Sequence, residues 1–153
     1  MRVSVQEADF DVAAELARLE ALGGGGVASF TGVVRGGDGL EALRLETYPG
    51  MTQRALEGIV EEAGRRWPLL GVTLIHRHGA IPVGGRIVLV AVASRHRAAA
   101  LEACAFLIDW TKTRAPFWKQ EQLSDGHMRW IEARPEDEAA AAAWNASAEH
   151  GRP

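Results

Sequence analysis

Two groups of cationic side chains flank an apolar segment between Ser94 and Lys119, and these residues are the best suited to chemistry. The 26 residues carry six cationic side chains and only two carboxylates, those of Glu102 and Asp109. The cationic residues are Arg95, His96, Arg97, Lys112, Arg114 and Lys119. Arginine forms bidentate contacts with phosphate or carboxylate groups, and lysine supplies a point charge. The residue types therefore predict a site for an anionic ligand.

The two lysines allow a second kind of chemistry. Lys112 shares a predicted helix stripe with Leu101, Ala105 and Ile108, at i, i+4, i+7 and i+11, and we expect this stripe to face the core. A lysine at the end of such a stripe either extends to water or lies in a partly desolvated pocket. If Lys119 shares that pocket, each charge disfavours protonation of the other, and a neutral amine becomes available as a base or nucleophile.

Each of these residues also has a simpler interpretation, which the sequence leaves open. A single arginine is most often a solvated surface group, and a histidine at a helix start often has no chemical role. Lys112 can extend its amine into solvent. The prediction of an anion site therefore depends on several cations occurring together.

The cations stand at the ends of predicted elements. Arg35 follows a β-rich segment, and the group around His96 joins an apolar strand to the start of a helix. Element ends are where a scaffold presents functional side chains. The helix start near His96 also offers backbone N–H groups and the positive end of the helix dipole.

Alternation and helical periodicity predict a mixed order of strands and helices. We expect strands at 1–6, 27–34, 40–48, 72–76, 86–94, 117–122 and 128–132, and helices at 10–21, 52–67, from about 96 to 114, and from 135 to 144. Hairpins rather than strict β-α-β alternation favour the α+β class. Residues 1–144 are predicted to form one domain, followed by a disordered tail at 145–153.

Several details of this prediction can be compared with coordinates. Asp9 is expected to cap the first helix, whose apolar side would hold Phe10, Ala13, Ala14, Ala17 and Leu22. The 27–34 strand is expected to be central and to pair with 40–48 across the glycine loop at 36–39. Thr52 is expected to cap a helix with Leu56, Ile59, Val60 and Ala63 inward, and 78–85 to be a turn-rich connector. The run 86–94 reads as a strand buried on both faces.

Composition excludes several classes of function. The net charge of −3 gives no overall attraction to nucleic acid or to an acidic membrane. The single cysteine, Cys104, allows no internal disulfide, and we expect it to be a buried packing residue without a chemical role. We find no CxxC or HExxH spacing, so we predict no metal site and no cofactor. No signal peptide or membrane span is recognisable, which makes the cytoplasm the expected compartment.

Seven segments of the chain resemble one known family. They are FTGVVR (30–35), LETYPGMT (45–52), RWP (66–68), IHRHG (75–79), SRHR (94–97), DWTKTRAPFWK (109–119) and RWIEAR (129–134). In this order they resemble the large, catalytic subunit of molybdopterin synthase, over roughly residues 27–144. The TKTRAPFWK block is the most specific of them.

The resemblance implies a sulfurtransferase of molybdenum cofactor biosynthesis. The family converts cyclic pyranopterin monophosphate to molybdopterin by installing a dithiolene. The sulfur arrives as a thiocarboxylate on the C-terminal Gly-Gly of a small ubiquitin-like partner subunit. The implied fold is an α/β hammerhead with an additional antiparallel β subdomain, and the implied assembly is a homodimer within a heterotetramer.

The resemblance also implies roles for individual residues. Lys112 and Lys119 match the family's two active-site lysines. Three residues, Arg35, His96 and Arg97, match its anion-contacting residues. Arg134 matches an arginine thought to reach in from the paired subunit. Neither the division of roles between the lysines nor the order of the two sulfur transfers follows from the sequence. The competing prediction is a non-catalytic module that binds an anion or a ubiquitin-like tail.

Overall fold

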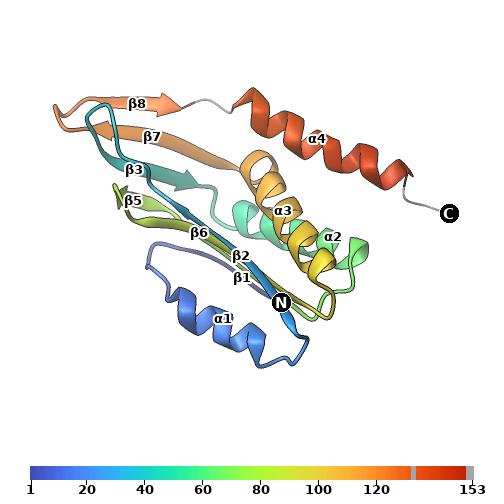
Figure 1. The fold of residues 1–153 in the computed structure, drawn as a ribbon. Helices are drawn as coiled ribbons and strands as arrows, with labels where there is room; N and C mark the ends of the chain where they lie inside the picture. The colour runs from blue at the N-terminus through green and yellow to red at the C-terminus, as the bar shows by residue number, and fades with distance from the viewer. Residues whose placement is uncertain (132–133, 151–153) are drawn as a thin grey trace.

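The computed structural model describes residues 1–131 and 134–150, with the side chains of 147–150 left undescribed. The elements run in the order β1 (Arg2–Gln6), α1 (Val12–Glu20), β2 (Gly26–Val33), β3 (Leu40–Thr47), α2 (Met51–Arg66), β4 (Gly71–Arg77), β5 (Gly79–Pro82), β6 (Arg86–Ser94), α3 (Arg97–Arg114), β7 (Phe117–Leu123), β8 (Met128–Ile131) and α4 (Pro135–His150). They form two four-stranded sheets, and the helices α1, α2 and α3 pack against the first of them, which confirms the α+β class (Figure 1).

The first sheet has the strand order β1-β4-β6-β2, and β6 is buried on both faces. Val88, Val90 and Val92 point to the side covered by α2 and α3. Leu89, Ala91 and Ala93 alternate with them and point to the side covered by α1. Because a strand alternates its side chains between the two faces, a strand covered on both needs an almost continuous apolar run. The prediction for 86–94 is confirmed.

The second sheet has the order β5-β3-β7-β8 and is antiparallel throughout. The prediction that β2 is central and pairs with β3 is wrong, because β2 is an edge strand bonded only to β6. The loop between them contains Gly37, Asp38 and Gly39, all with positive φ. This backbone directs the chain out of the first sheet, and β3 then finds partners on both sides in β5 and β7. The predicted connector at 78–85 contains β5.

The start and the buried side of α1 also differ from prediction. Asp11, not Asp9, caps the helix, because its Oδ1 accepts from the N–H of Ala14 at 3.1 Å. Asp9 bonds the neighbouring N–H of Phe10 instead. The helix buries Leu19 and the ion-paired Glu15, while its alanines are exposed. Leucine removes more apolar area from water than alanine does, and this decides the orientation.

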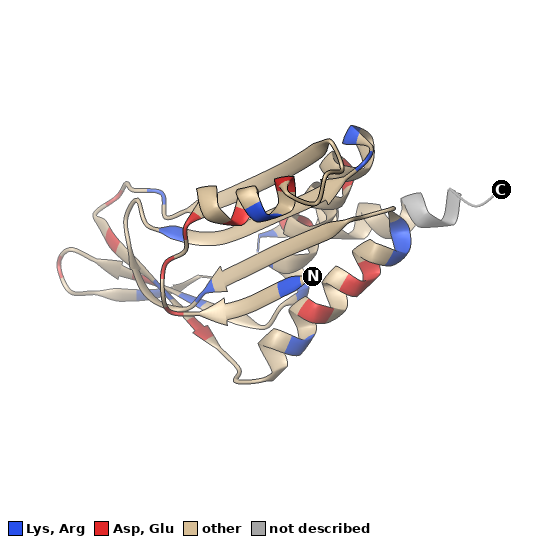
Figure 2. Cartoon of the chain, turned by 90° about the horizontal axis from the view of Figure 1, so that it is seen from below, with Lys and Arg blue, Asp and Glu red and all other residues tan. Residues whose placement is uncertain are grey.

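Helix α2 packs as predicted but begins differently. Its inward residues are Leu56, Ile59, Val60 and Ala63, as expected. Gly50 occupies the N-cap position, with φ at 80°. Thr52 lies inside the first turn, where its Oγ1 accepts from the N–H of Tyr48 and donates to the carbonyl of Pro116. Acidic and basic residues are interspersed along the helices (Figure 2).

The stripe of α3 predicted to face the core is mostly exposed. Leu101 is 61% exposed and Ala105 is also at the surface. The core instead receives Ala103, Phe106 and Leu107. Helix α3 contacts the first sheet, α2 and α4, so it buries a wide part of its circumference. Its apolar residues therefore lie on nearly every side, and helical periodicity cannot identify a single stripe as the buried one.

Helix α4 lies against α3 through a cluster of four aromatic side chains, Trp67, Phe106, Trp110 and Trp144. The indole N–H of Trp144 donates to Asp109 Oδ2 at 2.7 Å. The helix continues to His150, beyond its predicted end at 144. Residues 151–153 lie outside the described part of the chain. No helix among the described residues combines the length and apolar character that a membrane crossing needs.

Candidate active site

A cavity of about 400 Å³ opens where the two sheets meet at the C-terminal end of α3. Its walls come from the end of β2, from β4 and β6, from the last turn of α3 and from the start of β7. The side chains that carry polar or charged groups into its lining are those of Thr31, Arg35, His76, Thr111, Lys112 and Lys119. The lining contains no carboxylate, so its electrostatic character is cationic.

The turn between α3 and β7 holds the two lysines at the cavity. Lys112 lies in the last turn of α3, and Pro116 ends the helix because it cannot continue the hydrogen-bond ladder. The carbonyl of Pro116 accepts from Thr52 Oγ1 at 2.9 Å, which ties the turn to α2. Lys119 follows as the third residue of β7, paired with Leu45 on one side and Ile131 on the other. The second sheet therefore fixes the backbone of Lys119.

The surroundings of Lys119 perturb its amine. Burial lowers the pKa of Lys119 first, and the positive charge of Lys112 lowers it further. The carboxylate of Asp137 in α4 acts in the opposite direction, and the charge of Arg134 lowers the pKa again. Lys112 itself is an exposed residue at the cavity wall. Both lysines thus line the same cavity.

His76 is a buried member of the cavity lining to which no role follows from the sequence. Its ring is 6% exposed and stacks on the ring of Phe117, with centroids 3.8 Å apart. Nδ1 lies 2.8 Å from the backbone carbonyl of Arg77. Burial lowers the pKa of His76 to about 4, although the backbone hydrogen bond opposes this and the charges of Lys119 and His78 add to it. The imidazole is therefore neutral at pH 7.

A signal for His76 was available in the sequence. It ends the apolar run of β4, Gly71–Arg77, in which every residue before Arg77 is buried. A histidine in such a run must be neutral or paired, because burying an unpaired charge is costly. The segment IHRHG shows the residue but not the face to which it points.

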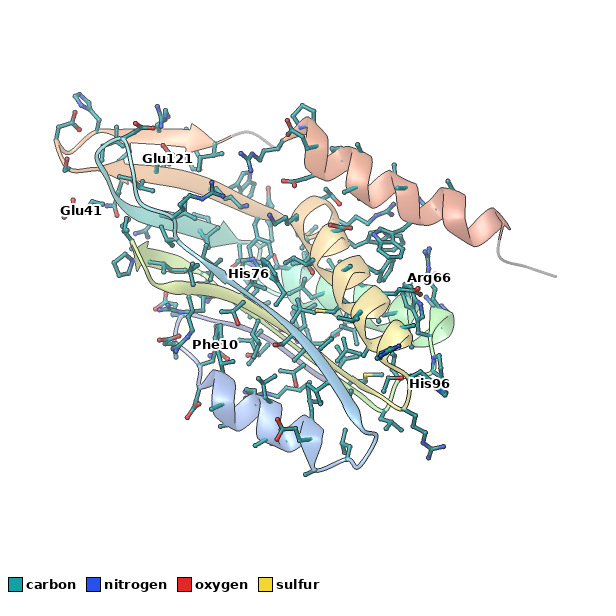
Figure 3. All side chains as sticks on the ribbon, viewed as in Figure 1. Phe10, Glu41, Arg66, His76, His96 and Glu121 are labelled. Carbon is teal, nitrogen blue, oxygen red and sulfur yellow. The ribbon has the colours of Figure 1, made fainter. Side chains whose placement is uncertain are left out.

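The structure brings together only part of the predicted set. Arg35, Lys112 and Lys119 line the cavity. His96 and Arg97 lie at the N-terminal end of α3, about 24 Å from Lys112 along the helix axis at ~1.5 Å per residue, so one subunit does not form a single cationic cluster. Figure 3 shows His76 and His96 near opposite ends of α3. Arg134 is exposed beside α4 and outside the lining, although its charge reaches Lys119.

A compositional signal also marks the site. Of the 17 basic residues, only Lys112 and Lys119 are lysines, and all the others are arginines. Both lysines of the chain therefore lie at the same cavity. Arginine cannot lose its proton in a protein, whereas a lysine with a lowered pKa can. The cavity therefore combines cationic groups that suit an anion with a lysine, Lys119, whose pKa is lowered.

Two further polar groups help to define the chemistry. Cys104 is buried in α3, and burial raises the pKa of its thiol to about 11, which does not suit a nucleophile. The hydroxyl of Thr111 is buried at the cavity and has no hydrogen-bond partner among the described residues. In the part of the chain that the structure describes, no group of His, Cys, Asp or Glu side chains has the arrangement of a metal site.

Known proteins that are similar to this chain in sequence and in structure carry the same family names. The model of the family described as MoaE protein matches residues 5–114. A relative from Mesorhizobium japonicum, named molybdopterin synthase catalytic subunit, is 51% identical over 151 residues, covering 96% of this chain and 95% of the relative. The solved structure of the molybdopterin biosynthesis MoaE protein from Burkholderia ambifaria superposes with a TM-score of 0.80 at 46% identity, covering 94% of this chain and 97% of that one. A molybdopterin synthase from Staphylococcus aureus gives a TM-score of 0.75 at 28% identity, covering 84% and 95%.

Proposed function

The chain belongs to the MoaE protein family, and from this premise we propose that it is the catalytic subunit of a molybdopterin synthase. It transfers sulfur from the thiocarboxylated C-terminus of a small ubiquitin-like subunit to cyclic pyranopterin monophosphate, and the product carries the dithiolene of molybdopterin. The observation that carries the proposal is the meeting of both lysines of the chain in one cavity without a carboxylate.

The charge of the cavity suits both reactants. The substrate carries a cyclic phosphate, and the partner's tail ends in an anionic thiocarboxylate. Arg35 at the cavity mouth is suited to bind the phosphate through bidentate contacts. An anion in a partly dry site lined by cations is stabilised more strongly than the same anion in water.

The two lysines are suited to different tasks. Lys119 is the more buried and has the lowered pKa, so we assign it proton transfer at the reacting centre. Lys112 is exposed at the cavity wall and is therefore accessible to an incoming tail, so we assign it charge stabilisation of the thiocarboxylate or transient acceptance of its acyl group. Cys104 takes no part, because the partner supplies the sulfur.

His96 and Arg97 can bind the same substrate only if a second copy of the chain presents them. Their distance from Lys112 within one subunit excludes direct contact with a ligand in that subunit's cavity. We therefore assign them to the cavity of the paired subunit in a homodimer. The charge of Arg134 reaches Lys119 of its own subunit, so for Arg134 a role in the paired subunit is supported only by the resemblance to the family. Two small subunits bound to this homodimer complete a heterotetramer. The cytoplasm is the compartment that we assign to this biosynthetic step.

The test is conversion of cyclic pyranopterin monophosphate by the chain mixed with thiocarboxylated small subunit, with dithiolene formation as the readout. Lys119→Ala is expected to lower kcat by at least about 100-fold, the typical effect of losing a proton-transfer group. Arg65→Ala is the matched control, because Arg65 is an exposed cation paired with Glu62 and does not belong to the cavity lining. Near-normal turnover by a folded Lys119→Ala protein would exclude the assigned role. Absence of any conversion by the unmodified chain would exclude the function.

A further inference from the structure

Two residues that line the candidate cavity, Lys119 and His76, carry complementary polar groups without a partner among the described residues. The ammonium of Lys119 makes no side-chain hydrogen bond or ion pair with any described residue. The Nε2 atom of His76 likewise has no hydrogen-bond partner in the described part of the chain. One group is a donor and the other is an acceptor, and both residues line the same cavity.

The orientation of the imidazole is fixed from two sides. The backbone carbonyl of Arg77 is only an acceptor, so Nδ1 must carry the proton that it donates across 2.8 Å. Nε2 then holds a lone pair. The stack on Phe117 holds the ring plane, and it joins β4 of the first sheet to β7 of the second. Lys119 lies two residues beyond Phe117 in β7, on the same face of that strand.

We propose that His76 is a positioning residue for Lys119: by rotating about its side-chain bonds, the lysine brings its ammonium to donate a hydrogen bond to Nε2 of the imidazole held between Arg77 and Phe117. The inference rests on the proposed function only for its catalytic consequence. The lysine side chain has enough rotatable bonds to bring its N–H donors to a fixed acceptor. The other side-chain acceptors in the lining are the hydroxyls of Thr31 and Thr111.

The hydrogen bond has a measurable effect on Lys119. A hydrogen bond that the imidazole accepts from the ammonium of Lys119 favours the charged form of the lysine. The bond therefore raises the pKa of Lys119, which burial and the charge of Lys112 lower. The charge of Asp137 also raises the pKa of Lys119, whereas the charge of Arg134 lowers it. The imidazole itself faces the charges of Lys119 and His78.

The first experiment uses the presence of only two lysines. Protein labelled with ¹⁵N and ¹³C in lysine gives two side-chain signals, and Lys112→Ala assigns them. His76→Phe keeps an aromatic ring against Phe117 but removes the acceptor, and it is expected to move the titration of Lys119 down by about one pH unit, a tenfold change in proton affinity. His76→Gln returns an acceptor near the position of Nε2 and is expected to restore most of the shift. His78→Phe is the control and is expected to leave the titration in place.

A second measurement does not require a His76 variant to fold. In histidine-labelled protein, the ¹⁵N shift of Nε2 distinguishes a bare lone pair from one that accepts a hydrogen bond. Lys119→Ala is expected to move this signal to the value of a bare lone pair, while Lys112→Ala leaves it unchanged. In the turnover assay, His76→Phe is expected to lower kcat about tenfold with a smaller effect on KM, and His76→Gln is expected to recover part of it.

The outcomes separate the inference from a purely structural role. If folded His76→Phe and His76→Gln give the same Lys119 titration, or if Lys119→Ala leaves the Nε2 signal in place, the hydrogen bond does not exist and the inference is overturned. Neither spectroscopic test needs substrate or partner, so failure of the proposed function leaves both results interpretable.

Discussion

Lowering the pH from 7 to 4 is expected to destabilise the protein through His76, and the size of the effect follows from its burial. The pKa of His76 is lowered from 6.5 to about 4 by desolvation in the folded state. Below pH 6.5 the unfolded chain therefore binds a proton that the folded protein resists. The stability that comes from burying a neutral imidazole is fully present above pH 6.5 and is lost as the pH falls through 4.

The magnitude follows from the difference between the two pKa values. A difference of roughly 2.5 units at about 1.36 kcal/mol per unit corresponds to about 3 kcal/mol. Because His76 is only 6% exposed, solvent screening does not reduce this figure much. A loss of this size is a large fraction of the stability of a typical domain, which is about 5–15 kcal/mol.

Carboxylates also titrate in this range, so the assay must isolate the histidine. Urea denaturation at pH 7, 5.5 and 4 gives the free energy of unfolding of the wild type and of His76→Phe. The advantage of the wild type over the variant is expected to fall by about 3 kcal/mol between pH 7 and 4, because the variant has no proton to bind. His96→Phe serves as the control, since His96 is exposed, and its curve is expected to run parallel to that of the wild type. A parallel curve for His76→Phe would refute the argument that desolvation controls His76.

The remaining predictions concern single groups. Thr111→Val is expected to raise the free energy of unfolding in urea by about 1 kcal/mol, because it removes a buried hydroxyl that lacks a partner in the described structure; destabilisation would show that the hydroxyl is satisfied. Removing the charge of Lys112 with Lys112→Ala is expected to raise the pKa of Lys119, and Asp137→Asn to lower it, in the NMR titration of labelled lysines; shifts of the opposite sign would contradict the electrostatic account. Cys104 is expected to react with iodoacetamide only on unfolding, and fast labelling of native protein would contradict its burial.

The local sequence pattern predicted the buried face of an element correctly where one arrangement buried far more apolar side chains than the others. The run from Arg86 to Ser94 has apolar residues at both odd and even positions, and a strand covered on both faces is the arrangement that buries all of them. Helix α2 offers one stripe containing Leu56 and Ile59, and that stripe is buried. Helices α1 and α3 are rich in alanine on several sides, so periodicity did not identify the face that packs. The division of strands between two sheets depends on contacts between segments far apart in sequence, which no local pattern contains.

The site was predictable in its residue types and less so in its geometry. Lys112 and Lys119 were found from charge at element ends, and both line the cavity. The separation of His96 from them follows from helix length, because the residues at the two ends of an 18-residue helix cannot meet. His76 was missed because its importance comes from a stack on a residue 41 positions away, Phe117, in another sheet.

The choice of lysine at both positions indicates what the cavity requires. Fifteen of the 17 basic residues are arginines, so the chain uses arginine wherever a positive charge alone is enough. Arginine at 112 and 119 would keep the charge and the affinity for an anion but would remove the group that can lose a proton. Burial and a neighbouring charge lower the pKa of Lys119, while Asp137 keeps it from falling further. The balance among these groups supports the proposal that the cavity both binds an anion and transfers a proton, which is the combination that sulfur transfer to a phosphorylated substrate needs.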